Sequence, residues 1–121
     1  MNKQFLLKKD GIYYLDNLRI LIKKNLFPNF NIRIENGFIL QQSIEFSKKD
    51  FSIQEVISND INIPLEKISN KTAKFKITEE DYNFIKSLTK LISNELNMRI
   101  YTAFTVKILL KNYFIALNKK L

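Results

Sequence analysis

Few side chains in this sequence could perform catalysis. The one acidic cluster among them can be explained by a structural role at the start of a helix. The 121-residue chain has no Cys and no His, which excludes cysteine nucleophiles, Ser-His-Asp triads and thiolate or imidazole metal sites. The cluster Glu79-Glu80-Asp81 lies where a helix is expected to begin, and the helix dipole favours acids there. Its members would project to different sides of that helix, so they form no acid/base pair. We therefore expect no enzyme activity, no metal site and no cofactor.

The charges of the chain point more clearly to a function. Lys and Arg number 20 against 12 Asp and Glu, a net charge of +8. Residues 71–121 hold 10 basic and 4 acidic residues, a net of +6, whereas residues 1–70 hold 10 and 8, a net of +2. Such an asymmetry raises the local affinity for anions. It favours a nucleic acid or an acidic protein surface as partner, and a merely solubilising surface is the alternative.

The last part of the chain predicts a strand followed by two helices. Apolar and polar residues alternate over 72–77, as in a half-buried strand with a basic outer face. Thr78 and Asp81 form a capping box at the start of a helix, and Asn97 is suited to the left-handed residue that ends it. A second helix is expected over about 100–118. The two helices are expected to form an antiparallel pair.

This order of elements resembles the ribbon-helix-helix family of DNA-binding proteins over residues 72–118. The resemblance implies that the strands of two chains pair into an antiparallel ribbon that enters the major groove. It also implies that Arg99 lies near a phosphate, because backbone N–H groups at the start of the second helix can bind one. The outward strand residues, which would then face the bases, are Thr72, Lys74 and Lys76.

Two pairs of lysines on the expected helices are further candidates for binding phosphates. Lys86 and Lys90 share one helix face, and Lys107 and Lys111 share another, each at a spacing of four residues. Like charges at this spacing mildly destabilise a helix, by a few tenths of a kcal/mol per pair (about 0.2–0.5). A functional reason such as phosphate binding would explain them, and an ordinary solvated face is the alternative.

The first part of the chain predicts hairpins and a helix. Asp10-Gly11 and Asn36-Gly37 each separate two apolar runs and suit a type I′ turn, so each predicts a β-hairpin. Between them, apolar residues at helical spacing predict a helix over 16–27, which Pro28 ends.

Ser52 is expected to cap a short helix that runs through about Ser58, and a further turn of helix can follow Pro64. The predicted fold class is therefore α+β, with N-terminal β-hairpins and a helix followed by a strand and a C-terminal antiparallel helix pair. The chain is expected to form a single domain, with a mixed α/β part over 1–70 and a strand-helix-helix part over 71–121.

The helix expected over 100–118 is apolar around nearly its whole circumference. A helix of this kind must be buried on more than one side, and a chain of 121 residues has little material with which to cover it. We therefore expect a homodimer with this helix at its centre, and a helix wrapped by the chain's own sheet is the alternative. The expected interface residues are Phe104, Ile108, Tyr113, Phe114 and Leu117.

The sequence supports functions of two classes. The first is a non-catalytic DNA-binding homodimer with an accessory or regulatory role, for example in a mobile element. The second is a protein-interaction module, such as an inhibitor or adaptor of phage or mobile-element origin, that docks on an acidic or nucleic-acid-binding protein. A third option is attachment to anionic lipid through the helix over 16–27. The N-terminal residues lack a secretory pattern and the most apolar window contains lysines, so we expect a cytoplasmic protein without integral membrane association.

Overall fold

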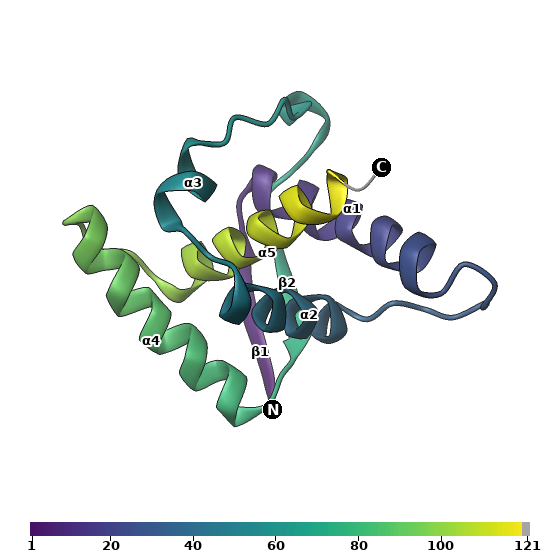
Figure 1. Cartoon of the computed structure of the whole chain (residues 1–121), viewed down its shortest axis with the longest axis horizontal. Coiled ribbons are helices and arrows are strands. Elements are labelled where there is room, and N and C mark those ends of the chain that lie inside the picture. The colour runs from purple at the N-terminus through teal and green to yellow at the C-terminus, as the bar shows by residue number, and fades with distance from the viewer. Residues whose placement is uncertain (120–121) are drawn as a thin grey trace.

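Helix α5 (Thr102–Asn118) runs through the middle of the computed structural model, which describes residues 1–119 (Figure 1). Helices α1 to α4 and strand β1 all contact it. In chain order the other elements are β1 (Asn2–Leu7), α1 (Lys9–Leu26), α2 (Asn36–Lys49), α3 (Ile53–Ser58), a short 3₁₀ turn η1 (Leu65–Lys67), β2 (Lys71–Lys76) and α4 (Glu79–Leu96). The α+β class is confirmed, and most of the chain is helical. None of the helices within residues 1–119 combines the length and the apolar character that crossing a membrane requires.

The first and eighth decades of the chain supply the two strands of one antiparallel sheet. Asn2 lies opposite Lys76, and Leu7 lies opposite Lys71. The ribbon-helix-helix resemblance implied that this second strand pairs with its counterpart in another chain, but here β2 pairs with β1 of the same chain. The inner face of the sheet is apolar and buried; it consists of Phe5, Leu7, Ala73 and Phe75.

The two predicted hairpins are wrong. Asp10-Gly11 lies in the first turn of α1, and Asn36-Gly37 opens α2. Neither glycine has the positive φ that a type I′ turn requires. The residues that follow each glycine repeat at helical spacing, and Ile12, Leu15 and the apolar positions after them are buried along one side of α1. The wider helical period therefore outweighed the local turn preference of the two dipeptides.

The other predicted elements are confirmed, with small shifts at their ends. The helix over 16–27 is the greater part of α1, and the short helix and the turn after Pro64 are both present. Thr78 Oγ1 accepts a hydrogen bond from the backbone N–H of Asp81 at 3.1 Å, and Asn97 is left-handed with φ 53° and ψ 44°. The predicted antiparallel pairing of the last two helices is not seen, because α4 and α5 diverge from the turn at Asn97 in Figure 1.

Helix α5 is covered by its own chain. Val106, Leu109 and Leu110 have no exposed surface, because α1, α2 and β1 pack around them. The premise that a single chain could not bury this helix is therefore wrong. The homodimer loses the reason given for it and stays a prediction. Of the residues expected at its interface, Ile108, Tyr113, Phe114 and Leu117 are buried within the chain, and Phe104 is half-buried.

The start of α2 lies directly against the edge of β2 that does not pair with β1. The Asn36 side-chain amide donates a hydrogen bond to the carbonyl oxygen of Lys74 at 3.0 Å. A Cβ atom on Gly37 would overlap the carbonyl oxygen of Lys76. Glycine is therefore needed here for close approach of two backbone segments rather than for an unusual dihedral angle.

We expect Gly37→Ala to destabilise the protein by roughly 1–3 kcal/mol, because the added methyl group must push β2 away from α2. Gly11→Ala is the matched control. Its Cβ would meet its nearest neighbour at 3.4 Å, an ordinary contact, and alanine favours a helix over glycine by up to about 1 kcal/mol. Urea unfolding of both variants tests this pair, and equal stability of the two would contradict the assigned role of Gly37.

Candidate functional site

The outer face of the sheet presents polar side chains from both strands. Because residues alternate between the two faces of a strand, Gln4 stands opposite Lys74 and Asn2 opposite Lys76, and all four side chains are exposed. Leu6 and Thr72 complete the exposed set as a third opposing pair. We call these residues the sheet face; they are Asn2, Gln4, Leu6, Thr72, Lys74 and Lys76.

A groove of about 970 Å³ adjoins the sheet face and contains five basic side chains and two acidic ones. It lies where the start of α2, the side of α1 and strand β2 meet. Asp16 and Glu35 are the acids, which leaves a net charge of +3. We call it the basic groove; its basic residues are Arg19, Arg33, Lys71, Lys74 and Lys76.

Arg19 is held in place at the wall of the basic groove. Its guanidinium donates hydrogen bonds to the carbonyl oxygen of Ile34 and to the side-chain oxygen of Asn36. These bonds tie α1 to the segment that leads into α2. Arg33 is more open and forms a 3.5 Å ion pair with Glu35 in which both side chains are exposed. The first residues of α2 line the same groove, so the positive end of this helix adds to its potential.

Of the eight residues expected to bind nucleic acid, Thr72, Lys74 and Lys76 lie together on the sheet face. Three others lie apart from them. Lys86 and Lys90 are exposed on α4, and Arg99 is exposed in the turn between α4 and α5. Lys86 Nζ lies 4.9 Å from the centre of the Tyr82 ring, and the Arg99 guanidinium lies 5.5 Å from the Tyr101 ring. None of these three lines the basic groove.

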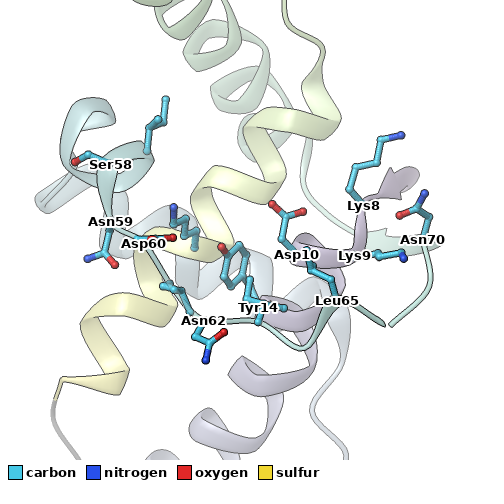
Figure 2. A pocket seen from close by; sticks show the side chains of 14 residues that line it. Lys8, Lys9, Asp10, Tyr14, Ser58, Asn59, Asp60, Asn62, Leu65 and Asn70 are labelled. Carbon is cyan, nitrogen blue, oxygen red and sulfur yellow. The ribbon is translucent and has the colours of Figure 1, made fainter. Parts of the chain in front are cut away.

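The last two expected residues, Lys107 and Lys111, are half-buried on the side of α5 that faces the start of α1. Lys107 Nζ lies 3.3 Å from Asp10 Oδ2, and these side chains are only 19% and 33% exposed. Lys111 lines a separate cavity of about 1020 Å³, together with Tyr14 and Asp60. We call this the charged cavity (Figure 2).

The charged cavity shifts the titration of two of its residues. Burial raises the pKa of the Tyr14 hydroxyl to about 12, with a smaller contribution from Asp10. Burial also lowers the pKa of Lys111, and the nearby ammonium group of Lys107 lowers it further. Asp10 and Asp60 act in the opposite direction on Lys111 without cancelling that effect.

Sequence reasoning missed the contribution of β1 and α1 to the basic surface. The alternation of Phe5 and Leu7 with Gln4 and Leu6 was a strand signal, but it was assigned to a local hairpin. Which side chains stand beside Lys74 depends on a pairing between residues about seventy positions apart, and no local pattern encodes that pairing.

No group of three or more Asp or Glu residues that could hold a metal ion occurs within residues 1–119. Comparison of the chain with models of known families, with curated proteins and with solved structures finds no match in any of the three.

The raised pKa of Tyr14 predicts a loss of stability at alkaline pH. An unfolded tyrosine ionises near pH 10, whereas folded Tyr14 keeps its proton up to about pH 12. Between these values only the unfolded state releases the proton, so the free energy of unfolding falls as the pH rises through this window. Urea unfolding of the wild type and Tyr14→Phe should give a steeper decline for the wild type above pH 10. Equal slopes would contradict the assignment.

Proposed function

We propose that this protein binds duplex DNA through the sheet face and acts as a non-catalytic accessory or regulatory factor. The observation that carries the proposal is the antiparallel pairing of β1 with β2, which sets Gln4 beside Lys74 and Asn2 beside Lys76 on one exposed surface. A two-stranded ribbon fits the major groove of B-DNA. Amide side chains pair with adenine there, and lysine pairs with the acceptors of guanine.

The basic groove supplies the contacts that such a ribbon needs with the DNA backbone. Arg19, Arg33 and Lys71 lie beside the ribbon, where they would neutralise phosphates while the sheet face contacts the bases. Contacts of this kind fix the orientation of a protein on the duplex without conveying sequence information. The positive end of α2 is a further donor for a phosphate.

The proposed mode differs from that of the ribbon-helix-helix family in the origin of its strands. Both strands come from one chain, so a single copy carries a complete ribbon. DNA binding in this mode therefore does not depend on the homodimer, and the oligomeric state is a separate question.

A second candidate function is docking on an acidic protein, and one surface favours it. A groove of about 510 Å³ beside α1 is lined by four basic residues and four apolar ones, with no acid among them. Ile20 and Ile32, which line it, are 63% and 44% exposed. A partner that combines apolar and acidic side chains would complement this groove. Substituting Ile20→Ser with Ile32→Ser should leave DNA affinity unchanged, which separates this groove from the sheet face.

We expect the double variant Lys74→Gln and Lys76→Gln to lose at least about tenfold in affinity for duplex DNA, because two charges leave the centre of the interface. The slope of log affinity against log salt should become shallower, because two positive charges leave the interface. Fluorescence anisotropy with a labelled duplex at several salt concentrations measures both quantities.

The matched control is Lys48→Gln with Lys49→Gln, which removes the same charge from the last turn of α2, away from the basic groove. It should change affinity and salt slope much less. Unchanged DNA affinity in the Lys74 and Lys76 double variant, with an intact circular dichroism spectrum, would overturn the proposed interface.

Base reading by the amide residues has its own test. Gln4→Ala removes no charge, so it should preserve the salt slope while relaxing the preference among duplexes that differ at one base pair, by a factor of about 5–150 (roughly 1–3 kcal/mol). Selection of preferred duplexes from a random pool identifies the sequences for this comparison. Loss of affinity that is uniform across all duplexes would instead assign Gln4 to backbone contacts.

A further inference from the structure

The charged cavity is a large space that shares no residue with the sheet face. It lies between the start of α1, the middle of α5 and the irregular segment that follows α3. In the view of Figure 2, Tyr14 lies between Asp10 and Asp60, and the ends of Lys8 and Lys9 lie on the far side of Asp10. Its volume of about 1020 Å³ is enough for a small molecule of metabolite size.

The hydroxyl group of Tyr14, at the wall of this cavity, has no partner within residues 1–119. Tyr14 is 3% exposed, and its hydroxyl makes no hydrogen bond to any group within residues 1–119. Every fully buried side-chain nitrogen or oxygen in that range does have a partner, so the Tyr14 oxygen must reach the open space. In the view of Figure 2 it points between the carboxylates of Asp10 and Asp60. A hydroxyl that opens into a cavity is a hydrogen-bond donor available to a ligand.

The charges around the cavity favour an anion of two negative charges. Lys8, Lys9 and Lys111 line it together with Asp10 and Asp60. Asp10 is already compensated by its ion pair with Lys107, which does not line the cavity. The three lysines of the lining then outnumber the one uncompensated carboxylate by two.

The direction in which the pKa of Lys111 is shifted agrees with an excess of positive charge around the cavity. Burial and the neighbouring Lys107 lower its pKa despite the presence of Asp10 and Asp60. The protonated amine is thus under-compensated by the protein itself, and a bound anion would supply the missing negative charge. Helix α1 also begins at this wall, where its positive end favours negative charge.

We propose that the charged cavity binds a small phosphorylated molecule, with the phosphate held by the Lys111 ammonium group and the Tyr14 hydroxyl. A phosphate monoester carries close to two negative charges at neutral pH, which matches the net charge of the lining. Lysine is a frequent phosphate ligand that acts as a point charge. The amide groups of Asn59 and Asn62, which also line the cavity, are available for hydroxyl groups on the rest of the molecule.

This site is independent of the proposed DNA interface, and the test keeps the two apart. Isothermal titration calorimetry with inorganic phosphate and with glycerol 3-phosphate, at constant ionic strength, measures binding to the full chain. We expect saturable binding of glycerol 3-phosphate. Tyr14→Phe and Lys111→Gln should each weaken it by about tenfold or more, the value of a hydrogen bond to a charged group.

Matched controls separate this site from general charge effects. Lys90→Gln removes one exposed lysine from α4 and should leave phosphate affinity unchanged. The Lys74 and Lys76 double variant should also bind glycerol 3-phosphate like the wild type, whereas Lys111→Gln should bind duplex DNA like the wild type. Tyr14→Phe removes only a hydroxyl without a protein partner, so its melting temperature should match that of the wild type below pH 10.

Three results would overturn the proposal. They are absence of saturable binding of glycerol 3-phosphate, equal affinity of the wild type and Tyr14→Phe, and tighter binding of succinate than of the phosphate ester. The last result would show that the cavity prefers carboxylates. Short duplex DNA could instead compete with glycerol 3-phosphate for the wild type but not for Lys111→Gln. That result would show that the cavity is part of the nucleic-acid interface and not an independent site.

Discussion

Burial of α5 by the rest of its own chain is the interaction on which this structure depends. Leu109 and Leu110 are completely enclosed, and removing a leucine side chain of this kind from water contributes about 1.5–3 kcal/mol. Because α5 is apolar around most of its circumference, no single neighbour can cover it. Helices α1 and α2 and strand β1 must all be in place together. The positions of the sheet and of the charged residues follow from that requirement.

The same requirement brings the two strands together and creates the sheet face. Strand β1 packs against α5, and β2 joins β1 because an unpaired strand leaves its backbone groups unsatisfied. Pairing directs Phe5 and Phe75 inward, with ring centres 5.8 Å apart, and directs the polar positions of both strands outward. The start of α2 then covers the remaining edge of β2 through Asn36. A ribbon with one solvated face and a covered β2 edge is the result.

Basic residues therefore fall into two environments that differ in their exposure to water. Lys74 and Lys76 lie on an exposed sheet beside other cations, which suits long-range attraction of an extended polyanion. Lys107 and Lys111 are half-buried against the start of α1, where one is paired with Asp10 and the other lines a cavity. Screening by salt is weaker in the second environment, which suits a small ligand. Net charge alone could not distinguish these two environments.

The sequence by itself determined the elements whose signals are local. The helix cap at Thr78, the left-handed Asn97 and the alternation in β2 each involve residues within a few positions of one another, and the structure has all three. Tertiary structure decided what those signals could not: that Asn36-Gly37 opens a helix, that β1 pairs with β2, and that one chain covers α5. In each case the free energy gained by burying side chains against distant residues exceeds the local conformational preference of the segment. The sheet face and the charged cavity form only in the tertiary structure, because both join side chains from distant parts of the chain.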